Sequence, residues 1–235
     1  MMTYDESYDL GCESCTIRTH PLFRHLGPEE LQEISLNKIT EIHKRGSVVY
    51  EEGNRIKGFY CVQKGIVKIY KTGIDGKEQI IRFAKPGDVI GYRSIVSNEP
   101  ACTTTEVLEE SILCHIPAEI LLSLIQKNGN FAVELMKLTC KELGEANSYI
   151  TDIAQKTVKE RLAEILIQLE EEFGEDEAGV LRVSLTREEL SNIVGTATES
   201  IIRLLSDFKN KGFLELNGRK IKILDKPGLK YIANM

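Results

Sequence analysis

The fold of the chain is decided by two neighbouring stretches, Leu185-Thr186-Arg187-Glu188-Glu189-Leu190 and Gly195-Thr196-Ala197-Thr198-Glu199-Ser200-Ile201-Ile202-Arg203-Leu204-Leu205. In the first stretch Thr186 precedes Glu189 by three residues, which is a capping box and predicts that a helix begins there. Gly195 is free to take the left-handed conformation that ends such a helix. Thr196 and Glu199 repeat the capping-box spacing and predict the start of a second helix. Two short helices joined by a tight, glycine-containing turn are typical of a helix-turn-helix.

A β-hairpin is predicted after the second helix. Leu214-Glu215-Leu216 and Lys220-Ile221-Lys222-Ile223 alternate between apolar and polar residues on either side of Asn217-Gly218, which is a strong turn signal. A helix-turn-helix followed by such a hairpin is a winged helix. The apolar residues of the second helix that we expect to face the core are Ile201, Leu204, Leu205 and Phe208.

The opposite face of the second helix carries the residues that we expect to read DNA bases, because the N-terminal part of this helix enters the major groove. The candidates are Thr198, Glu199, Ile202 and Arg203. Arginine bonds to guanine O6 and N7, and glutamate accepts from cytosine N4, so Glu199 and Arg203 predict a half-site that contains a G·C pair. The alternative is an ordinary exposed ion pair between these two residues, which lie four positions apart.

Basic and hydroxyl side chains around the same unit are expected to contact DNA phosphates, since such groups position a protein on the backbone. The candidates are Thr186, Arg187, Thr196, Ser200, Lys209, Lys211, Arg219, Lys220 and Lys222. The charge distribution is consistent with this, because residues 1–178 carry a net charge of −10 and residues 179–235 carry +4. A basic C-terminal part on an acidic body is typical of a nucleic-acid-binding domain.

Composition excludes several classes of protein. With 42% hydrophobic and 28% charged residues, the 235-residue chain has the balance of a globular protein. No stretch approaches the roughly 18 consecutive apolar residues of a membrane span. Met1–Glu6 is acidic and lacks an apolar core, so no export signal is predicted. Six cysteines without such a signal are expected to be reduced, which predicts a cytoplasmic protein.

Two further regions precede the winged helix. Between about residues 37 and 117, short apolar or alternating runs are separated by glycine turns, which predicts an antiparallel β-roll of the jelly-roll kind. Residues 129–155 are predicted to form a long helix with two apolar stripes. One stripe holds Phe131, Leu135 and Leu138, and the other holds Met136, Leu143, Ala146, Ile150 and Ile153. The heptad-like spacing of the second stripe suits pairing with a second copy of the chain, although a single helix lying on its own barrel is the alternative.

The predicted fold class is therefore α+β. Its parts are a sensor or effector β-roll at residues 1–128, a dimerisation helix at 129–155 and a winged-helix DNA-binding domain at 156–235. A hinge is expected near Ala154-Gln155-Lys156-Thr157, where the helix meets the DNA-binding domain.

A glycine-punctuated β-roll, a long dimer helix and a C-terminal winged helix together resemble the Crp/Fnr family of bacterial transcription regulators. The resemblance runs from about Cys12 to Leu224 and is most specific over Leu185 to Leu205. It implies a homodimer that binds double-stranded DNA at an inverted-repeat operator, works with RNA polymerase, and senses a small-molecule or redox effector in the β-roll. Glu199 and Arg203 match family positions that contact DNA, whereas Thr198 and Ile202 differ from the residues that the best-known members carry there.

The sensor departs from the cyclic-nucleotide-binding members of the family. Those members carry Gly-Glu for the ribose and a later Arg-Ser/Thr for the phosphate. Here the first run is Gly91-Tyr92-Arg93-Ser94, and the later segment 100–105 has no arginine. Without that arginine the charge-assisted grip on a cyclic phosphate is missing, so no tight cAMP binding is expected. The candidate pocket residues for another ligand are Arg82, Gly91, Tyr92, Arg93, Ser94 and Thr103.

The cysteines indicate an alternative sensor site. Cys12, Cys15 and Cys114 fall where the oxygen-sensing branch of the family has iron–sulfur ligands, and His20 lies beside Pro21, the position of the remaining ligand. A Cys₃His set suits an iron–sulfur cluster or zinc, whereas the alternative is an ordinary reduced pair and a buried apolar thiol. Haem is a further candidate cofactor, with no residue singled out as its ligand. The remaining cysteines, Cys61, Cys102 and Cys140, are interpreted as core or incidental residues.

Two other classes of protein compete with a regulator. A cupin-like metalloenzyme needs closely spaced histidines, but the chain has only His20, His25, His43 and His115 and no His-x-His. No catalytic motif is visible, so no catalytic residue and no enzyme activity are predicted. A ligand-binding or metal-binding β-roll without DNA function leaves the capping boxes and the wing unexplained.

Overall fold

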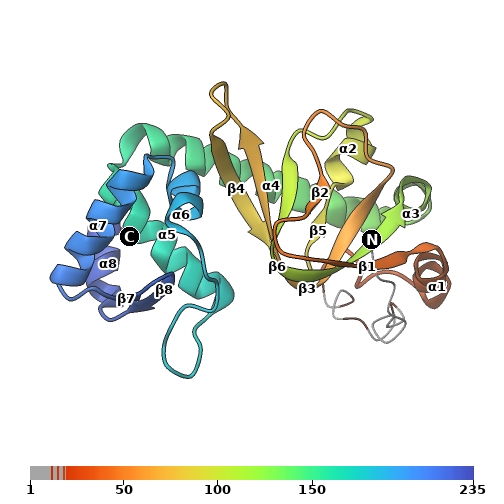
Figure 1. Cartoon of the computed structure of the whole chain (residues 1–235). Helices are drawn as coiled ribbons and strands as arrows, with labels where there is room; N and C mark the ends of the chain where they lie inside the picture. The colour runs from red at the N-terminus through yellow and green to blue at the C-terminus, as the bar shows by residue number, and fades with distance from the viewer. Residues whose placement is uncertain (1–11, 13–14, 16–17, 19) are drawn as a thin grey trace. The chain divides into compact units, whose positions relative to one another are not determined.

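The computed structural model describes Cys12, Cys15, Arg18 and residues 20–235. The segment Met1–Glu6, on which the expectation about export rests, lies outside the described residues. The chain divides into two compact units, residues 1–144 and 145–235, and the boundary falls inside one long helix (Figure 1). Each unit is described by itself.

The first unit is built on an antiparallel sheet whose strands run β1-β6-β3-β4, with β2 paired to β6 and β5 paired to β3. The strands are β1 (Ile39–His43), β2 (Val48–Tyr50), β3 (Gly58–Thr72), β4 (Glu78–Ala84), β5 (Val89–Ile90) and β6 (Thr104–Pro117). The predicted hairpin forms between β3 and β4, where Thr72 pairs with Glu78. Gly65, at φ 87°, lies so close to Ser111 and the Glu110 carbonyl in β6 that a Cβ atom there would collide with both. The antiparallel β-roll is therefore confirmed.

Helices cover this sheet and complete its core. They are α1 (Pro28–Asn37), α2 (Tyr92–Ser97), α3 (Ala118–Lys127) and the first part of α4 (Gly129–Gln155). Phe131 and Leu135 of α4 are buried in one apolar cluster with residues of α1, α3 and the sheet, and Leu138 packs against it. The first apolar stripe of the long helix thus faces the β-roll.

The second stripe of α4 remains exposed. The side chains of Met136, Leu143 and Ile150 are each about 60% exposed and that of Ile153 is 44% exposed. This row has no covering partner within the described residues. Such a face is suited to pairing with another helix.

The second unit holds the end of α4 and a small helical domain with one hairpin. Its elements are α5 (Val158–Phe173), α6 (Arg187–Val194), α7 (Thr198–Asn210), β7 (Leu214–Asn217), β8 (Lys220–Ile223) and α8 (Lys226–Ala233). The core includes buried side chains of α5, α7 and α8, such as Leu166, Phe208 and Leu229, and α6, β7 and β8 also contribute buried apolar residues. Ile201, Leu205 and Phe208 are buried as predicted, and Leu204 is half-buried. None of the helices described here is long and apolar enough to cross a bilayer.

Candidate nucleic-acid interface

The helix-turn-helix consists of α6, a glycine turn and α7. The predicted capping box at the start of α6 is present: the Glu189 N–H donates to Thr186 Oγ1 at 3.0 Å, and the Thr186 N–H donates to Glu189 Oε2 at 2.6 Å. Gly195 ends α6 at φ 72°, in the left-handed region. The sequence therefore predicted the first helix and its end correctly.

The second capping box was predicted wrongly. The N-cap of α7 is Ala197, not Thr196, and no side chain caps this helix. The Thr196 N–H instead donates to the Ser191 carbonyl at 3.1 Å, because the left-handed Gly195 folds the chain back on the end of α6. The hydroxyls of Thr198 and Ser191 are 3.1 Å apart and share a hydrogen bond, which ties the start of α7 to α6.

The wing also differs by one residue from the prediction. Asn217 pairs with Lys220 and ends β7, so the two-residue turn consists of Gly218 and Arg219 rather than Asn217 and Gly218. Gly218 takes the first turn position at φ 59°, which suits glycine better than asparagine. Arg219 thereby lies exposed at the tip of the hairpin.

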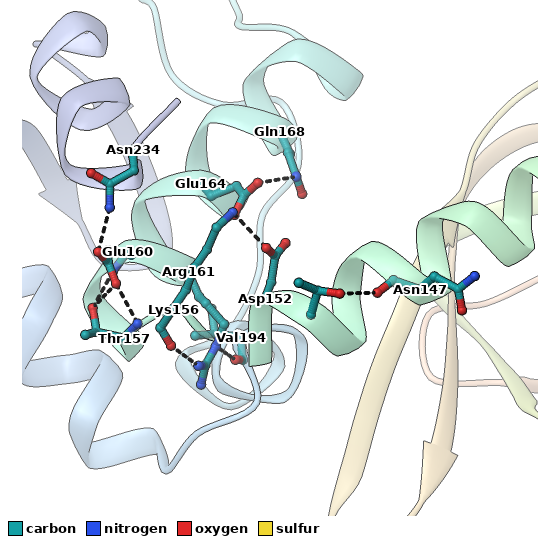
Figure 2. Close-up of polar contacts among 11 residues, drawn as sticks. Asn147, Asp152, Lys156, Thr157, Glu160, Arg161, Glu164, Gln168, Val194 and Asn234 are labelled. Carbon is teal, nitrogen blue, oxygen red and sulfur yellow. Dashed lines mark hydrogen bonds and ion pairs between the residues drawn. The ribbon is translucent and has the colours of Figure 1, made fainter. Parts of the chain in front are cut away.

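One buried arginine holds the turn in place. Arg161 of α5 is 9% exposed, and its Nε donates to the Val194 carbonyl at 3.0 Å (Figure 2). Its Nη1 donates to the Lys156 carbonyl at 2.7 Å and its Nη2 to the Gly195 carbonyl at 3.4 Å. The guanidinium fork thus connects the end of the long helix to the turn between α6 and α7. Sequence reasoning missed Arg161, because its role depends on carbonyls more than thirty residues away.

The four candidate base-reading residues lie along the first two turns of α7. Glu199, Ile202 and Arg203 are exposed, while Thr198 is half-buried and uses its hydroxyl on Ser191. Glu199 and Arg203 form no ion pair with each other or with another described residue, so the alternative ion-pair interpretation has no support in the geometry. The unpaired glutamate and arginine on the exposed face at the start of this helix are therefore available to contact the edges of DNA bases.

The candidate phosphate-contacting residues surround this helix start. Arg187 Nη2 donates to the Gly218 carbonyl at 2.8 Å, which brings the wing tip beside the first turn of α6. Burial lowers the pKa of the Arg187 guanidinium, and its Nη1 is buried without a hydrogen-bond partner. The half-buried candidates are Thr186, Arg187, Thr196, Ser200 and Lys222, and the exposed ones are Lys209, Lys211, Arg219 and Lys220. Lys211 pairs with Asp207 at 2.9 Å and the Lys222 ammonium donates to the Ala178 carbonyl, so these two are engaged within the protein.

Comparison with known proteins identifies both parts of the chain. A cyclic nucleotide-binding domain matches residues 41–128, and a Crp-like helix-turn-helix domain matches residues 160–232. The fumarate and nitrate reduction regulatory protein of Escherichia coli is 30% identical over 229 residues, which cover 95% of this chain and 90% of that protein. The chain belongs to the Crp/Fnr family of transcription regulators.

Other members agree with this assignment. Regulatory protein HlyX of Actinobacillus pleuropneumoniae is 29% identical over 219 residues, covering 91% of this chain and 90% of that protein. A solved Crp/Fnr-family structure from Eubacterium rectale has the same fold, with a TM-score of 0.75 and 24% identity over 92% of this chain and 98% of that one. The Crp/Fnr family consists of DNA-binding regulators that act as dimers, which sets aside the metalloenzyme interpretation.

In this Crp/Fnr chain the six candidate effector residues come together in one pocket of the β-roll. Arg82 of β4, the run Gly91 to Ser94 at the start of α2, and Thr103 all line it. Sequence reasoning missed four further lining residues, Tyr50, Ile69, Cys102 and Glu142. Gly91, at φ 82°, lies so close to Ile56 that a Cβ atom there would be 2.9 Å from its Cδ1. Any other residue at position 91 would strain the backbone, so this part of the pocket wall requires glycine.

The charged groups of this pocket meet at Glu142 of α4. Its Oε1 lies 2.9 Å from Arg82 Nη2, and its Oε2 lies 3.8 Å from Arg93 Nε. Arg93 Nη2 also donates to Cys102 Sγ at 3.3 Å, so Cys102 is part of the pocket and not incidental.

The cysteines gather at a second, apolar pocket in the same unit. Cys12, Cys15 and Cys114 line it together with Cys61, which lies directly opposite Cys114 across β3 and β6. His20 does not line this pocket, and its Nδ1 accepts a hydrogen bond from the Leu22 N–H at 3.2 Å. Burial raises the pKa of the Cys12 and Cys61 thiols, which favours their neutral form.

This thiol pocket has the donor atoms of a metal site but not their arrangement. Four thiols have suitable donor chemistry for iron–sulfur or zinc. However, among the residues that the structure describes, no three His, Cys, Asp or Glu side chains are placed to hold a metal ion. The arrangement as it stands does not fit a bound ion.

Proposed function

We propose that the chain is an effector-controlled homodimer that reads an inverted-repeat operator with Thr198, Glu199, Ile202 and Arg203 of α7. The observation that carries this proposal is the exposed, unpaired couple of Glu199 and Arg203 at the start of a helix whose turn is held by a buried arginine. A dimer through the exposed stripe of α4 would present two such helices to successive major grooves, about one DNA turn apart.

The phosphate-contacting residues proposed for this interface are Thr186, Arg187, Thr196, Ser200, Lys209, Arg219 and Lys220. Arg187 is supported as a link between the wing and α6 as well, because its guanidinium contacts the wing tip. The parts proposed are a sensor at 1–128, a dimerisation helix at 129–155 and a DNA-binding domain at 156–235. We further propose that the protein works in the cytoplasm and with RNA polymerase, as family membership implies.

Selection of binding sites from a random DNA library tests this function. The full chain should enrich an inverted repeat with a G·C pair in each half-site. A variant with Glu199→Ala should bind the enriched site less tightly and prefer it less over random DNA. Enrichment of no sequence, or of a single unrepeated half-site, would contradict the proposal.

The sensed signal has two candidate sites. The first is the pocket lined by Arg82, Gly91, Tyr92, Arg93, Ser94 and Thr103, whose residues converge on one cavity. The second is a redox event at the Cys12, Cys15 and Cys114 thiols, supported by their shared pocket with Cys61.

Purification without oxygen tests whether the sensor carries a metal cofactor. Iron with acid-labile sulfide would support an iron–sulfur sensor, and a haem absorbance spectrum would support a gas sensor. Protein without either would leave ligand binding in the pocket, or oxidation of the thiols themselves, as the sensed signal. Calorimetry with cAMP is expected to give no tight binding.

A further inference from the structure

The effector pocket already contains an anionic group, and that group belongs to the long helix. The Glu142 side chain is only 11% exposed, and both of its oxygens point to arginines of the β-roll. Its Oε1 is buried and meets Arg82 as an ion pair without the angular geometry of a hydrogen bond. With two arginines and one glutamate, the charged lining of the pocket is net positive.

The pocket also has donor capacity that Glu142 does not fill. The Tyr92 side chain is 2% exposed, and its hydroxyl lies near Glu142 and Thr139 without completing a well-formed hydrogen bond to either. Arg93 is 46% exposed and meets Glu142 only at 3.8 Å. A buried polar group without a partner is costly, so a ligand that accepts from it gains binding free energy.

We propose that the Glu142 carboxylate is a resident anion in this pocket, and that the effector carries a carboxylate or phosphate group which replaces it on Arg82 and Arg93. Both groups match the guanidinium fork, which binds planar or tetrahedral oxyanions through charge-assisted hydrogen bonds. The proposal rests on the proposed function, because it names the ligand class of an effector-controlled regulator.

Displacement of Glu142 has a direct consequence for α4. Glu142 adjoins Leu143 of the exposed stripe, so the ion pair and the pairing surface lie on successive residues of one helix. Release of the ion pair frees the helix from a tether to β4 just beside the stripe. Binding in the pocket and pairing of the helix are therefore coupled through one residue.

Thermal unfolding of the full chain in increasing inorganic phosphate or acetate, at constant ionic strength, tests the proposal without DNA. Glu142→Gln removes the resident charge and keeps the shape. We expect the half-saturating concentration of at least one anion to fall at least about tenfold in this variant. Phosphate alone would indicate a phosphorylated effector, and acetate alone a carboxylic acid. If Glu142→Gln does not fold, Glu142→Ala, which leaves more space, is measured in its place.

Two matched controls complete the experiment. Glu134→Gln changes a carboxylate of the same helix that pairs with Lys137, and it should respond as the natural chain does. The double variant Arg82→Gln with Glu142→Gln should not show the tighter anion binding of Glu142→Gln alone. Equal half-saturating anion concentrations for the natural chain and Glu142→Gln would overturn the proposal. Tighter anion binding that persists in the double variant with Arg82→Gln would overturn it as well. Failure of the DNA-binding function would instead appear as a lack of specific DNA binding, which this titration does not involve.

Discussion

Arg203 is an exposed cation on the first turns of α7 with no ion pair within the described residues, so its side chain is free to reach a base edge. Replacing it with alanine should cost about 1–3 kcal/mol of binding free energy at a specific site and little on random DNA. Fluorescence anisotropy with matched specific and random duplexes measures both values. Lys209→Ala is the control, because loss of a phosphate contact should weaken both complexes equally. An equal loss on both duplexes for Arg203→Ala would rule out its base-reading role.

Arg161 is the residue on which the position of the turn depends. Its guanidinium donates to three carbonyls, those of Lys156, Val194 and Gly195. Arg161→Met keeps the apolar stem but leaves these acceptors without their donor, so it should lower the free energy of unfolding of the C-terminal unit by about 2–4 kcal/mol.

Chemical denaturation followed by circular dichroism measures this loss. Arg219→Met, which replaces an exposed arginine in the same unit, is the control and should change the stability by less than about 0.5 kcal/mol. A loss for Arg161→Met no larger than that of the control would show that the turn is held by other contacts.

At the scale of elements, the two capping boxes show what local sequence can and cannot determine. Both have a hydroxyl residue three positions before a glutamate. At Thr186 the predicted box forms, with both of its hydrogen bonds present. At Thr196 the preceding Gly195 turns the backbone so that the Thr196 N–H bonds back to α6, and α7 begins one residue later than the local pattern predicts.

The exposed stripe of α4 is the element on which dimerisation depends. Burying a leucine or isoleucine contributes about 1.5–3 kcal/mol, and each residue counts twice in a symmetric pair. Leu143→Glu should therefore weaken the dimer at least about 100-fold and abolish tight binding to an inverted repeat. Sedimentation analysis measures the dimer affinity. Ser148→Asp, on another face of the same helix, should leave it unchanged, and an intact Leu143→Glu dimer would place the interface elsewhere.

At the scale of the molecule, the sequence predicted the order of the parts and the two apolar stripes of α4, because these follow from periodicity within single segments. It did not predict Glu142 in the effector pocket or Cys61 among the thiols. Glu142 lies in a helix far along the chain from Arg82, and Cys61 meets Cys114 only through the register of β3 and β6. Such neighbours are set by tertiary structure, which no local pattern encodes. The hinge near Ala154–Thr157 stays a prediction.

Stability of the β-roll should depend on pH through two half-buried histidines, His20 and His115. Burial lowers the pKa of His115 and of His20 below the ordinary value of 6.5. As the pH falls through 6.5, the unfolded chain therefore takes up protons before the folded one does, and the free energy of unfolding decreases. This contribution is fully present above pH 6.5 and is lost progressively on acidification.

Unfolding midpoints between pH 5 and 8 measure this dependence. His115→Gln should flatten the decrease on the acid side, whereas His25→Gln, at an exposed position, should not. An unchanged slope in His115→Gln would show that its burial does not disfavour protonation.

In the proposed complex, two winged helices held by paired α4 helices read two half-sites on one face of DNA. Binding affinity as a function of half-site spacing measures whether the two winged helices bind together. We predict tight binding when the half-sites lie about one turn apart, 10–10.5 base pairs, and a loss of at least about 100-fold when five base pairs are inserted, because half a turn moves one site to the opposite face. Equal affinity at both spacings would show that the two half-sites are not read by one pair of linked winged helices.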